Sequence, residues 1–363
     1  ATLGPATDDP EVVKGLICAG VDMFRLNVSH RSEPEEIDET VCRVKSVANK
    51  LNRDIGIFMD LQGPKIRIGT FVDGKVKVSK GDQIILTTDQ VDGTADRVSV
   101  SYPEFVSDIQ VEDPLFIDDG KIQLKVIDKS GNDVTCLVEK GGDLSNKKGV
   151  NLPQTALSIS ALSEKDKKDV TLAVKHRLAY IALSFVSTDK DVFDLRQYLD
   201  SLGGDNIQII AKIERQLAVD NIPSIVEAAD LVMVARGDLG VHLPISQVPA
   251  AQKFIISSCN KKGKEVITAT QMLESMTENP QPTRAESTDV HNAVLDGSDA
   301  IMLSGETSIG KYPNRAVEFM REISSIAEND IDHNDLRSKR VSYLDSKNSN
   351  QIDELIAHGA ANI

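Results

Sequence analysis

Short apolar runs rich in β-branched residues recur along this chain, and helix-like stretches separate them. The runs lie at residues 1–4, 23–28, 55–60, 180–185, 208–213, 231–235, 265–270 and 300–304. The helix-like stretches lie at residues 10–19, 33–51, 164–176, 188–202, 216–228, 246–262, 286–296 and 314–328. Strands that alternate with helices form a parallel sheet. Eight such strands predict an α/β fold of the TIM type, a (β/α)8 barrel, whose functional sites lie at the C-terminal ends of the strands.

The alternation stops between residues 66 and 152. Short segments there alternate between apolar and polar residues, at 75–78, 83–86, 97–100, 115–117, 123–127 and 134–138, and Gly and Asp turns separate them. This pattern predicts a small all-β domain inserted after a barrel strand. Gly63-Pro64 and Leu152-Pro153 stand at its two joins, which favours an insert that turns as a hinged lid.

The domain organisation follows from these changes of pattern. We predict a barrel domain of residues 1–65 and 153–330 and a lid domain of residues 66–152. Residues 331–363 are first polar and charged and then helix-like, which predicts a linker and the truncated start of a C-terminal α/β domain.

Composition narrows the possible partners. Of the 363 residues, 40% are hydrophobic and 27% are charged, as in ordinary globular proteins. The net charge of −15 argues against nucleic acids and anionic membranes as main partners. No stretch resembles a membrane span or a signal peptide. The cysteines (Cys18, Cys42, Cys136 and Cys259) are scattered, which predicts buried free thiols in a reducing cytosol.

The predicted strand ends carry groups suited to phosphate and metal chemistry. Lys212 and Glu214 lie two residues apart and therefore on the same side of their strand. An ammonium group binds phosphate oxygens, and a carboxylate binds a hard cation such as Mg²⁺. A surface salt bridge would explain this pair equally well. The other strand ends supply Arg25, Asp60, Arg236, Asp238, Thr270, Ser304 and Glu306, and together they favour an active site.

Several of these residues have a more specific interpretation. Gly237 lets backbone amides approach an anion, although a tight turn with Asp238 as a helix cap is the simpler explanation. Asp238 is placed to join Glu214 on one metal ion. Arg67 lies at the entry to the insert, and its guanidinium can donate two parallel hydrogen bonds to a phosphate. A moving lid would carry it toward the strand ends.

Eight motifs resemble those of the pyruvate kinase family. They are ATLGPA (1–6), RLNVSH (25–30), DLQGPKIR (60–67), AKIE (211–214), MVARGDLGV (233–241), TATQMLESM (268–276), PTRAE (282–286) and IMLSGET (301–307). The resemblance implies a glycolytic phosphotransferase that moves the phosphoryl group of phosphoenolpyruvate to ADP and gives pyruvate and ATP. It also implies Mg²⁺ or Mn²⁺ as cofactor, a mobile β-rich lid and a cytoplasmic homotetramer.

The resemblance assigns roles residue by residue. Lys212 contacts the phosphoryl group during its transfer, Arg25 and Arg67 bind that group, and Glu214 and Asp238 bind the divalent cation. Substrate-binding positions are Ala235, Arg236, Gly237, Asp238, Thr270 and Ser304, with Thr270 near the enolate and Glu306 orienting its neighbours. Nucleotide-binding positions are Pro5, Arg25, Asn27, His30 and Lys165.

One departure from the family pattern concerns potassium. The resemblance implies a K⁺ site formed by Asn27, Ser29, Asp60 and Leu61. Potassium-dependent members carry Glu where this chain has Lys65 and Thr where it has Ile68. A lysine ammonium near that site would repel K⁺ and pair with Asp60, so we predict that K⁺ is not required.

Two other functions are compatible with the same residues. One is a Mg²⁺-dependent aldolase or lyase acting on a phosphoenolpyruvate- or pyruvate-type enolate, which shares the carboxylate pair but needs neither Lys212 nor a lid. The other is a catalytically silent barrel that binds ligands. The sequence does not indicate the allosteric effector, the oligomeric state, the preferred nucleoside diphosphate or the final proton donor.

Overall fold

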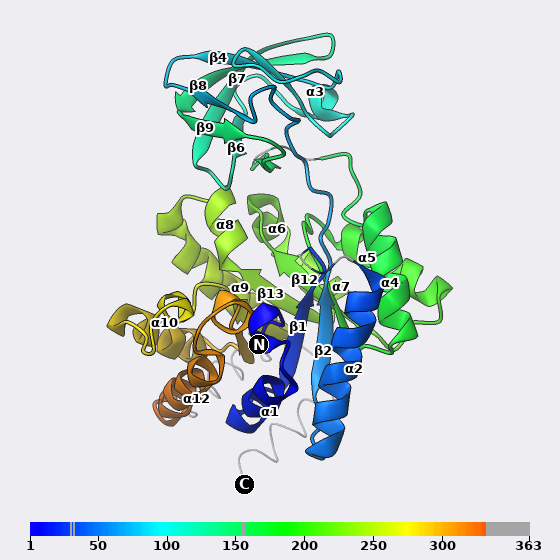
Figure 1. Ribbon diagram of the computed structural model, residues 1–363, viewed down its shortest axis with the longest axis vertical. Helices are drawn as coiled ribbons and strands as arrows, with labels where there is room; N and C mark the ends of the chain where they lie inside the picture. Colours follow the sequence, from blue (N-terminus) through cyan, green and yellow to red (C-terminus); the bar gives the residue numbers. More distant parts are fainter. Residues whose placement is uncertain (30, 32, 154, 156, 332–363) are drawn as a thin grey trace, which may run out of the picture.

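The structure is a computed structural model that describes residues 1–29, 31, 33–153, 155 and 157–331. His30 and nearly all of the predicted linker and C-terminal segment lie outside the described residues. The described chain has two parts (Figure 1). A parallel sheet with its helices forms the larger part, and a mainly antiparallel β unit stands at the C-terminal ends of the sheet strands.

The larger part contains a seven-stranded parallel sheet in the order β1-β2-β11-β12-β13-β14-β15. Its strands are β1 (Met23–Asn27), β2 (Gly56–Asp60), β11 (Tyr180–Leu183), β12 (Gln208–Ile213), β13 (Leu231–Ala235), β14 (Glu265–Ala269) and β15 (Ala300–Met302). This is the curled sheet of the predicted α/β barrel, and each strand lies within or beside a predicted run.

The eighth predicted strand is wrong as a full strand. Thr2 forms only an isolated parallel bridge with Arg25. Its side-chain oxygen donates to Leu303 O at 2.8 Å, and its N–H donates to Thr307 Oγ1 at 2.9 Å. The segment therefore joins the two edges of the sheet, with backbone bonds toward β1 and side-chain bonds toward the end of β15.

Helices follow the strands, as predicted. They are α1 (Pro10–Ala19), α2 (Pro34–Lys50), α4 (Glu164–Lys175), α5 (Asp189–Ser201), α6 (Gln216–Asp220), α7 (Ile222–Ala228), α8 (Arg236–His242), α9 (Val248–Lys262), α10 (Arg284–Leu295), α11 (Gly305–Ser308) and α12 (Pro313–Asn329), with 3-10 turns η1 (Pro5–Thr7), η2 (Ile245–Gln247) and η3 (Glu274–Thr277). The side chains of Asp9, Ser163 and Thr283 cap α1, α4 and α10. The single helix predicted at 216–228 is two helices, because Pro223 cannot donate the hydrogen bond that would continue α6.

The barrel strands bury both faces. One face packs against the helices in a large core that includes Phe24, Met59 and Ile209. The other face points into the barrel, where it forms a second cluster of Phe58, Ala182, Ile210, Leu231, Met233, Ile267, Ala269 and Met302. Side chains two residues further along each strand lie on this same inner face, one layer closer to the strand ends.

The β unit has its own sheets and core. A six-stranded sheet has the order β10-β6-β7-β8-β4-β5, and β3 pairs with β9. The elements are β3 (Lys75–Val78), β4 (Gln83–Thr87), β5 (Arg97–Ser99), α3 (Phe105–Asp108), β6 (Pro114–Ile117), β7 (Ile122–Ser130), β8 (Asp133–Lys140), β9 (Gly142–Ser145) and β10 (Val150–Asn151). Their core is separate from both barrel clusters. The sequence pattern missed β9, β10 and α3, which are short.

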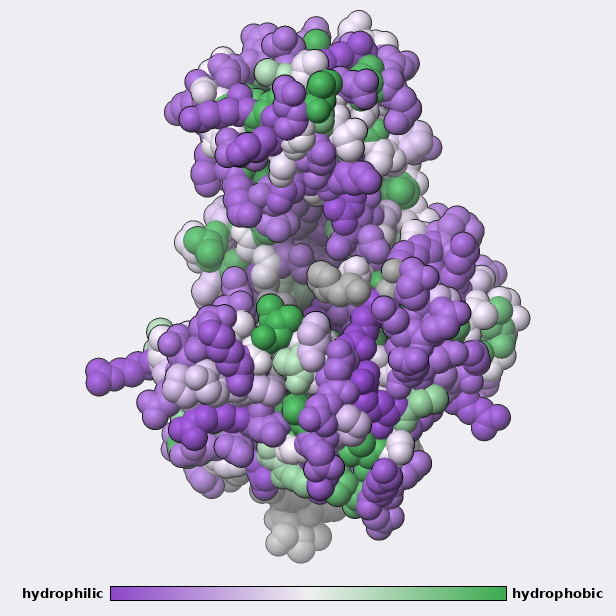
Figure 2. Space-filling view, in the orientation of Figure 1, coloured by the Kyte–Doolittle hydropathy of each residue, from purple (hydrophilic) through white to green (hydrophobic). Residues whose placement is uncertain are grey.

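A hydrophilic hollow separates the β unit from the barrel on the face shown in Figure 2. None of the described helices is long and apolar enough to cross a membrane. All four cysteines are free thiols. The prediction of buried thiols is correct for Cys136 and Cys259 and wrong for Cys18 and Cys42, which are exposed on α1 and α2.

Candidate active site

Four polar side chains from neighbouring strands form one layer above the apolar interior of the barrel. Arg25, Asp60, Ser184 and Lys212 each lie two residues after an inner-face residue of β1, β2, β11 or β12. The alternation of strand faces therefore brings them together, as the spacing of Lys212 and Glu214 predicted for β12.

Lys212 is the centre of this layer. Its Nζ lies 2.7 Å from Glu214 Oε1, 3.0 Å from Asp60 Oδ1 and 2.7 Å from Ser184 Oγ. Only 7% of the residue is exposed. Burial alone would lower the pKa of Lys212, but the carboxylates of Asp60, Glu214 and Asp238 outweigh it and raise the pKa above its ordinary value. The ammonium is therefore charged at neutral pH.

The two carboxylates beside Lys212 differ in their other partners. Asp60 Oδ2 accepts from Arg25 Nε at 2.7 Å and lies 2.6 Å from Arg25 Nη2. Burial opposes ionisation of Asp60, yet Lys212 and Arg25 lower its pKa below the ordinary value. Burial raises the pKa of Glu214 above its ordinary value, with Lys212 acting against this rise. Glu214 Oε2 also accepts the Phe185 N–H at 2.9 Å.

The turn from β13 into α8 presents backbone rather than a side chain to the site. The Gly237 N–H donates to Thr270 Oγ1 at 2.7 Å. Arg236 points elsewhere, because its guanidinium donates to both oxygens of Asp289 at 2.7 and 2.8 Å and to the carbonyls of Thr270 and Gln271. Asp238, next in the chain, is close enough to Lys212 and Glu214 to influence the pKa of each.

Thr270 and Gln271 have left-handed backbone conformations, with φ of +69° and +53°. A β-branched residue adopts this conformation only at a cost, and such strain is common at functional sites. Arg236 holds both residues there through their carbonyl oxygens, at 2.6 Å for Thr270 and 3.0 Å for Gln271. The sequence pattern gave no sign of this strain, because it results from a contact 34 residues away.

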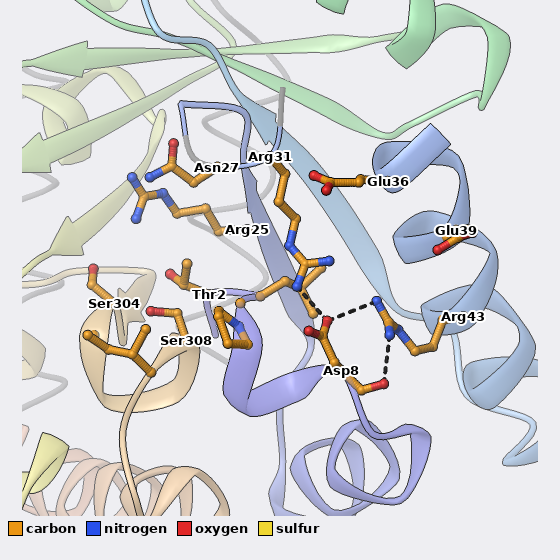
Figure 3. Close-up of a pocket in the computed structure, with 15 residues that line it drawn as sticks. Thr2, Asp8, Arg25, Asn27, Arg31, Glu36, Glu39, Arg43, Ser304 and Ser308 are labelled. Carbon is orange, nitrogen blue, oxygen red and sulfur yellow. Dashed lines mark hydrogen bonds and ion pairs between the residues drawn. The ribbon is translucent and has the colours of Figure 1, made fainter. Parts of the chain in front are cut away.

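A cavity of about 840 Å³ opens beside this layer (Figure 3). Its lining includes the predicted residues Pro5, Arg25, Asn27 and Ser304. The buried Ser304 Oγ has no hydrogen-bond partner among the described residues. The Ser304 N–H and the Leu273 N–H donate to the carboxylate of the fully buried Glu306.

Sequence reasoning missed a cluster in the wall of this cavity. Asp8 lies between Arg31 and Arg43, at 2.5 and 3.3 Å (Figure 3). Both arginines also donate to Thr40 Oγ1. These residues are not at strand ends, so the rule that found the other candidates did not apply to them.

The remaining predicted residues lie around the same strand ends. Ser29 N–H donates to Asn27 Oδ1 at 3.0 Å. Leu61 O accepts from Ser184 Oγ. Lys165 Nζ lies 3.1 Å from Val28 O and 2.7 Å from Asp169.

Two basic residues lie at the entry to the β unit. Arg67 donates to Lys147 O at 2.8 Å within that unit, and its hydrogen bonds among the described residues reach none of the predicted site residues. The predicted pairing of Lys65 with Asp60 is wrong, because Arg25 and Lys212 occupy both oxygens of Asp60. Lys65 is exposed, and its side chain instead lies in the fields of Arg67 and Asp238; partial desolvation together with Arg67 lowers its pKa.

Both connections to the β unit are anchored on the barrel by a buried charge. Asp166 accepts the N–H groups of Gln62 and Gly63 at 3.0 and 3.2 Å. On the return connection, Arg215 donates to Leu152 O at 3.0 Å and to Thr155 O at 3.1 Å. Neither anchor was predicted, although Arg215 directly follows Glu214.

The donor set for a metal ion is small. Within the described part of the chain, no three His, Cys, Asp or Glu residues are grouped as a metal site. Glu214 and Asp238 supply two carboxylates at neighbouring strand ends, and this fits Mg²⁺, which takes few protein ligands and completes its shell with water and substrate oxygens.

The comparisons with known proteins agree with one another. A family model described as "Pyruvate kinase, barrel domain" matches residues 1–317. Relatives named pyruvate kinase from Staphylococcus haemolyticus and Bacillus licheniformis are 44% and 43% identical over the whole chain. The chain spans 62% of the length of these relatives. A crystal structure of a pyruvate kinase from Cryptosporidium parvum matches with a TM-score of 0.92 and 38% identity, covering 94% of this chain and 71% of that one.

Proposed function

The chain belongs to the pyruvate kinase family, and from that premise we propose that it transfers the phosphoryl group of phosphoenolpyruvate to ADP, giving pyruvate and ATP. The observation that carries the proposal is the buried Lys212 ammonium, held between two carboxylates at the strand ends and beside Arg25. A charged group fixed at this place neutralises the phosphoryl oxygens as they move between substrates.

The proposed roles follow the layout of the strand ends. In the reaction the bond between phosphorus and the enol oxygen breaks, an ADP oxygen bonds to phosphorus, and the enolate gains a proton at its methylene carbon. Lys212 and Arg25 supply positive charge to the phosphoryl group, and the backbone of the Ala235–Gly237 turn receives the substrate carboxylate. Thr270, whose hydroxyl accepts the Gly237 N–H, is assigned to the enolate. The cavity lined by Pro5 and Asn27 takes the nucleotide.

A divalent cation is part of the proposal. Glu214 and Asp238 would hold Mg²⁺ or Mn²⁺, which when bound would polarise the phosphoryl and enolate oxygens. The Lys212 ammonium contacts Glu214 at 2.7 Å and keeps that carboxylate at the mouth of the barrel. Asp238 is close enough to Glu214 to influence its pKa.

The β unit has the position of a lid over these groups (Figure 1). We propose that residues 66–152 form a domain that closes over the site and brings Arg67 to the phosphoryl group, excluding water. The separate core of this unit and the anchored connections at Asp166 and Arg215 support rigid-body motion.

The deciding experiment is an assay of pyruvate formation from phosphoenolpyruvate with the complete protein. We expect pyruvate only when ADP and Mg²⁺ are both present, with ATP formed in equal amount. Pyruvate release without ADP would instead favour a lyase or aldolase, and no turnover would favour a silent binding barrel. Sedimentation of the complete protein tests the homotetramer that family membership suggests, and cell fractionation tests the cytoplasmic location.

We also propose that K⁺ is not required. Lys65 brings a positive charge into the field of Asp238, where a monovalent cation would otherwise be attracted. A K⁺ titration in K⁺-free buffer with constant ionic strength should change the rate less than twofold. The Lys65→Glu variant should become K⁺-responsive, and several-fold activation of the unmodified protein by K⁺ would contradict the proposal.

A further inference from the structure

The Lys212 ammonium has three N–H donors, and three acceptors surround it. Two are the carboxylates of Asp60 and Glu214, which form ion pairs with it, and the third is the uncharged hydroxyl of Ser184, which accepts a hydrogen bond from it at 2.7 Å. We propose that Ser184 is a positioning residue that aims the Lys212 ammonium at the phosphoryl group. This inference rests on the proposed function, because it concerns the same reaction.

The Ser184 hydroxyl has a fixed orientation. It has one hydrogen, which it donates to Leu61 O at 2.8 Å, so a lone pair of the oxygen must face the Lys212 ammonium. Leu61 is itself held by its N–H bond to Ala182 O at 3.0 Å. Ser184 is 3% exposed, so water does not compete for these bonds. The acceptor is therefore as rigid as the sheet that carries it.

The two carboxylates cannot fix the ammonium in the same way, because each has a second task. Asp60 is shared with Arg25 at 2.6 Å. Glu214 is a proposed ligand of the divalent cation, and its carboxylate charge would then be shared between that cation and Lys212. Ser184 has no other cationic partner among the described residues. It is the acceptor whose contact with Lys212 remains the same when the charges around the site change.

The experiment compares three substitutions of Ser184 in the complete protein. Ser184→Ala removes the acceptor, Ser184→Cys keeps the volume but accepts hydrogen bonds weakly, and Ser184→Thr keeps the hydroxyl. We expect kcat to fall about tenfold or more in the Ala and Cys variants, equivalent to about 1.4 kcal/mol. The KM for phosphoenolpyruvate should stay within twofold, and the Thr variant should recover most of kcat.

The matched control is Ser187→Ala. Ser187 is a half-buried hydroxyl on the same connection between β11 and α5, but it contacts Phe185 O and Arg215 rather than Lys212. Its kcat should stay within twofold of the unmodified protein. Full activity of Ser184→Ala, or full recovery by Ser184→Cys, would overturn the proposal, because the latter would mean that only volume matters. If the Thr variant does not fold, the contrast between Cys and the unmodified protein decides alone.

A second measurement does not depend on turnover. Crystal structures of the metal-free unmodified protein and of Ser184→Ala should show the Lys212 Nζ displaced in the variant. An unmoved ammonium would overturn the positioning role whatever the kinetics. If the unmodified protein fails to convert phosphoenolpyruvate and ADP, the proposed function fails, and the position of Nζ still decides whether Ser184 fixes Lys212.

Discussion

Replacing Lys212 by Met should make the stability of the protein depend on pH in a way that the contacts around it define. Methionine fills a similar volume but removes the charge shared by two buried carboxylates. Asp60 keeps Arg25 as a partner at 2.6 Å, whereas the direct contact that Glu214 keeps among the described residues is the Phe185 N–H at 2.9 Å. Glu214 therefore becomes a buried carboxylate without an ion-pair partner among the described residues. Breaking a buried ion pair in this way costs about 3–5 kcal/mol.

Protonation of Glu214 limits this penalty. Neutralising a carboxyl whose ordinary pKa is about 4.3 costs about 5 kcal/mol at pH 8 but only about 1 kcal/mol at pH 5. The pKa of Glu214 is already raised by burial in the unmodified protein, and the variant should raise it further. Between the unfolded and folded pKa values the folded state then binds more protons than the unfolded state. The stability of the variant therefore falls as the pH rises above about 4.3.

The measurement is urea unfolding followed by circular dichroism at pH 5 and pH 8. We expect Lys212→Met to lose about 3–5 kcal/mol at pH 8 and about 1 kcal/mol at pH 5. The double variant Lys212→Met/Glu214→Gln should recover most of the loss at pH 8, because the unpaired charge is gone. Equal losses at the two pH values, or no recovery in the double variant, would refute the assignment of Glu214 as the unpaired group. In the same protein kcat should fall by at least about 10²-fold with little change in the KM for phosphoenolpyruvate.

Two further predictions concern Arg215 and Arg236, whose structural contacts the sequence did not predict. Arg215→Met should speed amide hydrogen exchange in residues 157–162 and lower the free energy of unfolding by about 1–3 kcal/mol, because two buried carbonyls lose their donor. The control is Arg196→Met, which breaks a half-exposed ion pair with Asp230. Unchanged exchange in Arg215→Met would show that Arg215 does not anchor the connection. Arg236→Lys should lower the thermal unfolding midpoint and kcat together, because lysine cannot bind Asp289 and the carbonyls of Thr270 and Gln271 at once. A variant of unchanged stability would mean that Thr270 and Gln271 keep their left-handed conformation without the Arg236 guanidinium.

The sequence was sufficient for the parts of the site that follow from strand periodicity. A residue two positions beyond an inward-facing apolar residue must itself face inward, so Lys212 and Glu214 could be placed together from β12 alone. The same rule would have found Ser184, two residues beyond Ala182, if it had been applied to an uncharged side chain. Residues 1–4 were predicted to be a strand, because their amino-acid types do not indicate that Thr2 forms a single β-bridge.

The parts that the sequence did not give depend on contacts between distant residues. The strain at Thr270 exists because Arg236, 34 residues earlier, holds its carbonyl. Arg215 anchors a carbonyl 63 residues away, and Asp166 anchors an amide 104 residues away. The position of Arg67 depends on how the β unit stands over the barrel, which no local pattern specifies. Such residues become visible only when the fold has brought their partners near.

Because Lys65 does not pair with Asp60, its proposed effect on K⁺ binding needs another physical cause. Arg25 and Lys212 are positive and Asp60, Glu214 and Asp238 are negative, so the groups at the strand ends carry a net charge of −1. Lys65 lies in the field of Asp238 and adds one positive charge without forming an ion pair with Asp60. A glutamate at that position would change the local charge by −2 and attract a monovalent cation. We therefore infer that Lys65 acts through the summed field of the site, so that a K⁺-responsive Lys65→Glu variant should also become more sensitive to ionic strength.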